Sequence, residues 1–382
     1  MTAAELLDYI PRTKLEDLSI EHQVDYQVKK LDGITMFQLL LYSFLTTRQN
    51  SYRVMEEFYH SFAFGELAVN VHQGVRYNSL RDRLVSINPD FFDAIFRFCY
   101  QKFQKELDKN QNIVLFDSTL VSASSKILQQ GIRINKKGDK RYVKFSVGIK
   151  QIPIHVKVFT EQAYASEDTA LFESIDSCEL SPEDIVVFDR GISSRKVFDS
   201  LSVKKQQFVT RLNDHVRSDI LEEYPIDEKE NQGKLVFESD QKVKLYNRKH
   251  KPTKSYLRLI RCTQKDSKKP LTFLTNIENL SVSEVAAIYK QRWEIEVFFK
   301  FIKQQFNFSH LMSRNENGIK VVLYMTLISA ILLTAYKRAN HLKGYKIPKL
   351  KLANEIEKLI IRDIALKCGG DPDKINNYFN SS

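Results

Sequence analysis

Cysteine is scarce in this sequence, and its spacing excludes two classes of protein. The 382 residues include only four cysteines, Cys99, Cys178, Cys262 and Cys368. No two of them form the closely spaced CxxC pair that zinc sites use, and they are too few to hold together a small secreted fold by disulfides. A protein of the reducing cytoplasm is therefore expected.

The sequence also has no pattern typical of a signal peptide or of a membrane-spanning helix. The first residues, MTAAELLDYIPRTKLED, carry acids where a signal peptide carries bases, and they contain no long apolar core. The longest uncharged apolar run, residues 321–336, has 16 residues, whereas a helix needs about 20 to cross a bilayer. We expect a buried core helix there, and no membrane association.

The composition is that of a folded protein with a basic surface. Apolar residues make up 43% of the chain and charged residues 27%, which is typical of globular domains and not of disordered ones. The 58 Lys and Arg outnumber the 47 Asp and Glu, giving a net charge of +11 and a pI near 9.2. This excess favours a polyanionic partner, and nucleic acid is the first candidate.

The two ends of the chain have helical patterns. Apolar residues recur at helical spacing between residues 1 and 108, and a short helical appendage is expected at 341–382. Asn78 or Ser79 is a possible N-cap of one N-terminal helix. Arg81 and Arg83 follow it, so a helix-turn-helix contact with DNA is one interpretation and a solvated helix face is the other.

Two short, wholly apolar strands are predicted to end in aspartates. Ile113–Phe116 precedes Asp117, and Ile185–Phe188 precedes Asp189, Arg190 and Gly191. Such runs indicate strands covered on both faces. Sites in open α/β sheets gather at the carboxyl ends of strands, so Asp117 and Asp189 are candidates for one site. The alternative is that either aspartate caps a following helix.

Further strands and two basic segments complete the pattern. Residues 142–150 and 155–160 alternate as paired strands, 170–177 suits a helix, and 206–278 has the short strands and turns of a β-rich insertion. Residues 242–269 hold eight Lys and three Arg against one acid. Candidate phosphate contacts are Lys136, Lys137 and Lys140 in the loop 126–144, and Arg248, Lys249, Lys251 and Lys254 in the insertion.

A predicted helix at 289–303 carries four polar groups on one stripe. At about 100° per residue, Tyr289, Arg292, Glu296 and Lys303 share one side of the helix. The remaining circumference is largely apolar, which predicts burial on several sides. A buried carboxylate needs a partner, and either a metal or an i,i+4 pair with Arg292 supplies one for Glu296.

Asp117, Asp189 and Glu296 together form a hard-oxygen ligand set. Such a set suits two Mg²⁺ or Mn²⁺ ions better than zinc. Two ions about 4 Å apart can activate a water or a 3′-hydroxyl and stabilise the leaving oxygen of a phosphoryl displacement. The pattern predicts a nuclease or a strand-transfer enzyme.

At these residues the sequence resembles the DDE transposases of the bacterial insertion sequence 4 family. Their signature is Tyr, two residues, Arg, three residues, Glu, six residues and Lys, and it is matched here from Tyr289 to Lys303. FDST at Asp117 and FDRG at Asp189 are similar to the family's two aspartate motifs. Some members hold a flipped base with a tryptophan of the insertion, whereas the single tryptophan here, Trp293, lies in the signature segment.

The resemblance implies an α/β fold with a ribonuclease H-like mixed sheet, a β-rich insertion and helical flanking regions. The implied ranges are 1–108 (helical, DNA-binding), 109–205 and 279–340 (catalytic core), 206–278 (insertion) and 341–382 (helical appendage). Asp117, Asp189 and Glu296 would hold the metals. Tyr289, Arg292 and Lys303 would contact phosphates next to the scissile bond, and Arg190 would contact either phosphate or the carboxylates.

The expected function is DNA transposition, with double-stranded element ends and target DNA as partners. A homodimer is implied because the two ends of the element must be brought together. The implied location is the cytoplasm, at the nucleoid. Two alternatives remain: a nuclease of the same fold that cuts without joining, and a degenerate element that only binds DNA.

Overall fold

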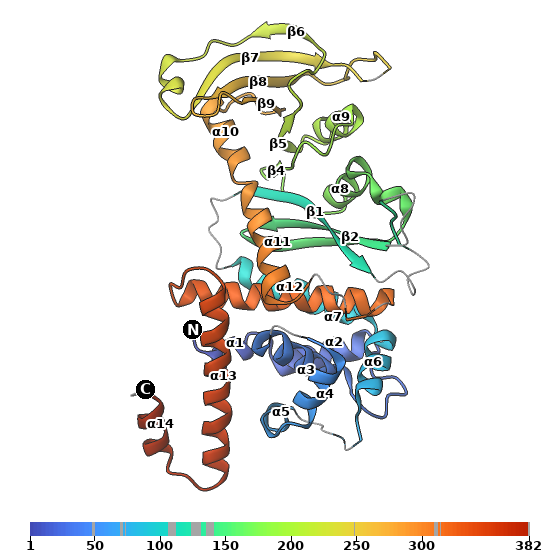
Figure 1. Ribbon diagram of the computed structural model, residues 1–382, viewed down its shortest axis with the longest axis vertical. Helices are drawn as coiled ribbons and strands as arrows, with labels where there is room; N and C mark the ends of the chain where they lie inside the picture. The colour runs from blue at the N-terminus through green and yellow to red at the C-terminus, as the bar shows by residue number, and fades with distance from the viewer. Residues whose placement is uncertain are drawn as a thin grey trace. The chain divides into compact units, whose positions relative to one another are not determined.

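The computed structural model describes the chain at residues 1–47, 50–68, 72, 74–105, 112–123, 131–134, 141–247, 249–308, 312–313 and 315–380. Contacts divide it into two compact units (Figure 1). The helical unit comprises Met1–Leu107, Val121–Gln129 and Lys300–Ser382, and the sheet unit comprises Asp108–Leu120 and Gln130–Phe299. The N- and C-terminal helical regions therefore fold together, and the core strands share one unit with the insertion.

The helical unit is built around one long apolar helix, α12 (Glu316–Ala339). By length and composition α12 is the one helix, among the described residues, that is able to cross a membrane, but 89% of its apolar window is buried inside the protein. The prediction of a core helix is confirmed. Its neighbours are α1 (Ala3–Leu7), α2 (Arg12–Glu21), α3 (Gly33–Thr46), α4 (Tyr52–His60), α5 (Phe62–Leu67), α6 (Tyr77–Ser86), α7 (Pro89–Gln104), α13 (Lys346–Lys367) and α14 (Pro372–Asn380).

Two predictions about α6 are wrong. The N-cap of α6 is Arg76, not Asn78 or Ser79. Arg83 is only 8% exposed, and its guanidinium donates to the carbonyls of Leu31 and Val24 and to Asp25. Arg83 therefore ties α6 to the segment between α2 and α3 and is not available to DNA. Arg81 is exposed and donates to its neighbour Asp82, as expected for a solvated helix face.

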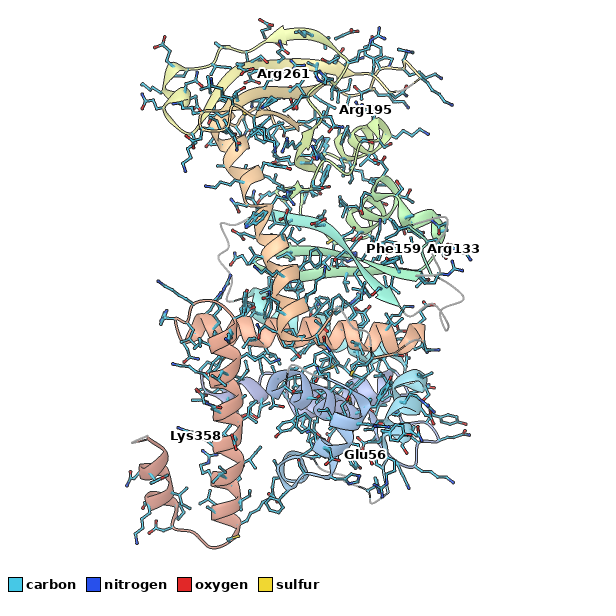
Figure 2. The ribbon with its side chains drawn as sticks, viewed as in Figure 1. Glu56, Arg133, Phe159, Arg195, Arg261 and Lys358 are labelled. Atoms are coloured by element: carbon cyan, nitrogen blue, oxygen red, sulfur yellow. The ribbon has the colours of Figure 1, made fainter. Side chains whose placement is uncertain are left out.

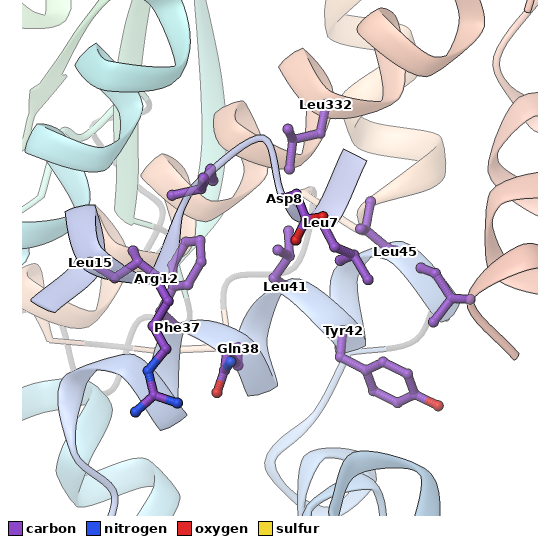
Figure 3. Close-up of a pocket in the computed structure, with 12 residues that line it drawn as sticks. Leu7, Asp8, Arg12, Leu15, Phe37, Gln38, Leu41, Tyr42, Leu45 and Leu332 are labelled. Carbon is purple, nitrogen blue, oxygen red and sulfur yellow. The ribbon is translucent and has the colours of Figure 1, made fainter. Parts of the chain in front are cut away.

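A cavity of about 210 Å³ lies within the helical unit (Figure 3). Its walls are mainly leucines of α1, α2 and α3, together with Leu332 of α12 and Ile356 of α13. Arg12 stands at its rim, where its Nε donates to Glu16. This mainly apolar lining does not bring together a set of catalytic groups.

The sheet unit holds a mixed nine-stranded sheet in the order β3-β2-β1-β4-β5-β9-β8-β7-β6. β1, β4 and β5 are parallel neighbours, and the strands from β9 to β6 form an antiparallel extension of the same sheet. The strands are β1 (Ile113–Ala123), β2 (Arg141–Lys150), β3 (Ile152–Phe159), β4 (Ile185–Val187), β5 (Gln207–Leu212), β6 (Ser218–Glu223), β7 (Leu235–Leu245), β8 (Leu257–Gln264) and β9 (Pro270–Thr275). The predicted α/β class with a ribonuclease H-like mixed sheet and a β-rich insertion is confirmed.

Helices cover both faces of this sheet. On one face, α8 (Glu167–Asp176) and α9 (Arg195–Val203) pack on a core of Val114, Phe116, Val186, Phe188, Phe208 and Leu274. On the other, Phe273 of β9 contacts Tyr289 of α10 (Val282–Lys290), with ring centroids 5.4 Å apart. Successive residues of a strand point to opposite faces, so the odd-numbered neighbours of the core residues face α10.

Three strand predictions need correction. β1 does not end at Asp117 but continues to Ala123 beside β2, because β-branched and small residues keep the strand pattern after the aspartate. β7 is one strand of 11 residues with a bulge between Phe237 and Ser239, longer than the short strands expected in this segment. β6 was missed because its sequence, SDILEE, is that of an exposed edge strand.

Candidate active site

Asp117 and Asp189 emerge side by side from neighbouring strands. β1 and β4 run parallel with Leu115 paired to Val187, and each aspartate follows its paired residue by two positions. Strand alternation turns both away from the core residues Phe116 and Phe188, toward the α10 face. The pairing register therefore brings the two carboxylates to the same part of the sheet, although Asp117 lies within its strand and not at the end.

The chain around Asp189 is held by side chains of the neighbouring strand. The Thr210 hydroxyl donates to the carbonyl of Phe188 at 2.9 Å and to that of Asp189 at 3.2 Å. The Phe188 ring stacks between those of Phe198 and Phe208. Asp189 Oδ1 accepts from the Gly191 N–H at 2.7 Å, so it stabilises its own turn and does not cap α9.

The signature segment is two helices and not one. α10 ends at Lys290, and α11 runs from Trp293 to Gln305. Between them the N–H groups of Gln291, Arg292 and Glu294 donate to carbonyls three residues earlier, a 3₁₀-type turn. Burial on several sides is also wrong, because Trp293 is 62% exposed and Val297 45% exposed.

Arg292 joins the groups of this segment. Its Nη2 donates to Glu296 Oε1 at 2.5 Å, the i,i+4 pair that was one of the two interpretations of Glu296. Its guanidinium also lies 5.9 Å from the Tyr289 ring centre. Burial, the largest single influence, lowers the pKa of Arg292, but the nearby Glu296, Tyr289 and Asp117 together raise it above its ordinary value. Arg292 is therefore a cation close to two carboxylates, Glu296 and Asp117.

Two charged residues near the aspartates were not predicted as site residues. The first is Arg211 of β5, which lies close enough to Tyr289 to affect its pKa. Burial raises the pKa of Tyr289 overall, whereas Arg292 and Arg211 lower it. The Nε of Arg211 is buried without a hydrogen-bond partner in the described part of the chain. The alternation of side chains along β5 could have identified Arg211 from the sequence. Phe208 and Leu212 face the core, so Arg211 faces α10.

Glu167, the first residue of α8, is the second addition. Its Oε1 accepts from Lys144 Nζ at 2.9 Å, while its Oε2 is buried with no partner among the described residues. A Cβ at Gly191 would lie 2.8 Å from Asp189 Oδ1 and 3.2 Å from Glu167 Cγ, so a larger residue there would displace the Asp189 carboxylate. Lys144, expected near a phosphate-binding loop, is 1% exposed and belongs to β2.

The carboxylates repel one another and favour binding of a cation. The pKa of Asp117 is raised to about 7: burial raises it most, Asp189 and Glu167 also raise it, and the Ser118 N–H and Arg292 lower it. Their oxygen donors have the chemistry that Mg²⁺ or Mn²⁺ prefers. Among the described residues, however, no three such side chains are grouped in metal-binding geometry. Glu296 is paired with Arg292 through its Oε1 atom.

The raised pKa makes a stability prediction for metal-free protein. A folded-state pKa of about 7 for Asp117, against about 3.9 in unfolded chains, means that stability falls as pH rises from 4 to 7. Asp117→Asn should remove this loss and raise the free energy of unfolding at pH 8 by up to about 4 kcal/mol, but not at pH 4. Urea unfolding in EDTA at both pH values measures it.

The exposed Asp266→Asn provides the control, because Asp266 lies on the hairpin between β8 and β9, outside the carboxylate group. A difference between wild type and Asp117→Asn that is the same at pH 4 and pH 8 would contradict the assigned cause.

The remaining predicted residues lie in several places. Lys303 follows Glu296 by two turns of α11 and is partly buried, in the portion of α11 that belongs to the helical unit. Arg190 is exposed, and so are Lys249, Lys251 and Lys254. Lys136, Lys137, Lys140 and Arg248 lie outside the described residues.

Part of the basic charge of the insertion is neutralised internally. Arg258 makes a two-pronged ion pair with Asp240, and both side chains are less than a tenth exposed. Arg258 also donates to the Leu280 carbonyl at 2.5 Å, which fixes the start of α10 relative to the sheet. Lys242 pairs with Glu278. The charge count of residues 242–269 therefore overstates what faces a ligand.

Comparison with known proteins agrees with this arrangement of acids. A family model described as the transposase DDE domain matches residues 108–332. The chain belongs to the DDE transposase family. It is 24% identical to a putative transposase for insertion sequence element IS4SA of Synechocystis sp., over 70% of this chain and 78% of the relative.

Two further relatives of this DDE transposase match a smaller part of the chain. A putative transposase, y4zB, of Sinorhizobium fredii is 26% identical over 47% of this chain and 49% of its own. A probable transposase for insertion sequence element IS5377 of Geobacillus stearothermophilus is 24% identical over 40% of this chain and 39% of its own. Enzymes of this family are metal-dependent and act on DNA, which agrees with the carboxylate cluster and the basic surface.

Proposed function

We propose that this protein is the transposase of an insertion sequence, of the insertion sequence 4 type. It cuts DNA at the ends of the element and joins the freed 3′-hydroxyls to target DNA. The observation that carries the proposal is the paired register of Asp117 and Asp189 on the sheet face where α10 packs. The Tyr289, Arg292 and Glu296 segment adds its polar groups at the same place.

Each of these residues has a proposed role. Asp117, Asp189 and Glu296 hold two Mg²⁺ or Mn²⁺ ions, which supply activation of the attacking hydroxyl and stabilisation of the leaving oxygen. Arg292 offers a planar fork of N–H donors to a phosphate next to the scissile bond, and Tyr289 and Lys303 are further phosphate contacts. Arg190 is exposed beside Asp189 and is proposed as a phosphate contact and not as a partner of the carboxylates.

The partners follow from the reaction. Double-stranded terminal repeats and target DNA are the substrates, and a homodimer brings two element ends together. The place of action is the cytoplasm, at the nucleoid. The proposed DNA contacts in the helical region and the insertion, Arg81, Lys249, Lys251 and Lys254, are exposed and compatible with a phosphate backbone.

A cleavage and joining assay tests the proposal. The protein is incubated with labelled terminal repeats of the element, a target plasmid and Mg²⁺, and products are separated by size. Joined products support a transposase. Cutting without joining identifies a nuclease of the same fold, and binding without cutting identifies a degenerate element; either result overturns the proposal.

A further inference from the structure

A second feature of the sheet unit is a cleft of about 690 Å³ beside Asp189. It is formed by the loop after β4, the loop after β5 and the turn after β7. The cationic and imidazole side chains of its lining are Arg190, Arg195, Lys196, His215, Arg217 and Lys249. Figure 2 labels Arg195, near the start of α9. No residue of this lining except Arg190 and Lys249 was identified from the sequence.

The lining contains one carboxylate, Asp168, which accepts hydrogen bonds from neighbouring serines. Asp168 Oδ1 accepts from the N–H groups of Ser193 and Ser194 at 2.7 Å each, and its Oδ2 accepts from the Ser193 hydroxyl. Within the described residues, no carboxylate lies within ion-pair distance of the five Arg and Lys side chains of the cleft. The cleft therefore has an excess of positive charge, which its single carboxylate, Asp168, offsets only in part.

Two arginines of the cleft are fixed by neutral groups and keep their charge for a ligand. Arg195 donates to the carbonyls of Tyr246 at 3.2 Å and Ser193 at 2.6 Å. Arg217 donates to His250 Nδ1 at 2.7 Å and lies 5.2 Å from the Tyr246 ring centre. A guanidinium has five N–H donors, so each retains several for phosphate oxygens.

The size of the cleft restricts the ligand. Its volume is that of a pocket for a drug-sized molecule, which accommodates a few linked nucleotides but not a double helix. Arg190 lines the cleft and is joined by one peptide bond to Asp189, and Asp168 of the lining is the neighbour of Glu167, so the cleft lies close to these carboxylates. A strand that leaves the reacting phosphate in this direction meets the cations of the cleft.

We propose that this cleft binds the sugar–phosphate backbone of a single DNA strand that continues from the scissile phosphate. Arg195, Lys196, Arg217 and Lys249 contact its phosphates. This rests on the proposed function, since it takes DNA as the substrate. It adds that the protein binds an unpaired strand in this cleft, in addition to duplex DNA.

Binding of a fluorescent dT hexamer, followed by anisotropy in EDTA over a range of salt, tests the proposal. The variant is Lys196→Gln, Arg217→Gln and Lys249→Gln, three exposed side chains whose loss leaves the core intact. Affinity at low salt should fall at least tenfold. The slope of log affinity against log salt should flatten by up to about 2, at about 0.7 for each lost contact with a single strand.

The matched control is Lys265→Gln, Lys268→Gln and Lys269→Gln, which removes the same charge from exposed positions of the same unit. Leu235 pairs with Gln264, so these lysines lie at the other end of β7 from Leu245. Ten residue steps at about 3.3 Å separate the two ends by about 33 Å. The control should bind the hexamer as wild type does.

A cleft variant with wild-type affinity and slope overturns the proposal, and so does a control that weakens binding equally. A blunt 20-base-pair duplex is titrated in parallel. If the cleft variant loses duplex binding but not hexamer binding, the cleft face holds duplex and the single-strand assignment is wrong. Because EDTA prevents cleavage, these results do not depend on whether the protein cuts or joins DNA.

Discussion

Asp117→Asn, Asp189→Asn and Glu296→Gln are each expected to lower the rate of DNA cleavage by a factor on the order of 10³ or more. Each amide keeps the size of the side chain but removes the negative charge that a divalent cation needs. Groups that act as a unit lose their function together, so a triple variant should be little worse than a single one. Single-turnover cleavage of labelled element ends with Mg²⁺ measures the effect.

DNA binding by the three variants should remain near that of wild type, because duplex affinity comes mainly from phosphate contacts by basic residues. Asp176→Asn is the matched control: it removes a carboxylate of α8 that is partly exposed and paired with Lys204. Its cleavage rate should be unchanged. Efficient cleavage by a carboxylate variant would remove that residue from the site.

The aspartates were predictable because two local signals coincide. Ile113–Phe116 and Ile185–Phe188 are apolar throughout, which indicates strands covered on both faces. Each is followed by an aspartate, and a carboxylate next to a buried strand needs a partner or a ligand. The pairing register that brings them together is not a local property. It depends on which strands become neighbours, and it became visible only with Leu115 opposite Val187.

The residues that were missed or misplaced depend on long-range contacts. Arg83 is a surface residue by helical pattern, but carbonyls of residues 24 and 31 bind it. Glu167 reads as an ordinary acid in the first turn of a helix, and only the fold brings it to Lys144. No glycine or proline marks the break between α10 and α11 at Gln291–Arg292. The break is visible only in the backbone hydrogen bonds, which there join residues three apart.

The same break explains how one arginine meets groups of two helices. A continuous helix predicted Tyr289 and Arg292 on one stripe, whereas the 3₁₀-type turn places Arg292 between α10 and α11. From there its guanidinium reaches the Tyr289 ring and Glu296, and it is close enough to Asp117 to lower the pKa of that carboxyl, against the larger raising effect of burial. Arg292 thus provides positive charge beside Glu296 and Asp117.

Arg292→Gln is accordingly expected to have opposite effects on metal binding and on cleavage. Without DNA, the variant should bind Mn²⁺ several-fold more tightly, because Glu296 loses its 2.5 Å bond to Arg292 and a competing positive charge disappears. With DNA and Mg²⁺, cleavage should fall about 10²–10³-fold, the usual cost of removing one donor that stabilises a transition-state charge. Calorimetry with Mn²⁺ and single-turnover cleavage measure the two effects.

Arg292→Lys and a matched ion pair separate this role from that of an ordinary helix pair. Lysine keeps the charge but loses the planar fork, so cleavage should still fall more than tenfold if Arg292 binds phosphate through two N–H groups. Arg12→Gln is the control, because Arg12 and Glu16 form a pair of the same i,i+4 spacing in α2, and an exposed pair of this kind contributes only about 0.3–0.5 kcal/mol. Wild-type cleavage in Arg292→Gln and Arg292→Lys would leave Arg292 with no more than the helix-pairing role that Arg12 has.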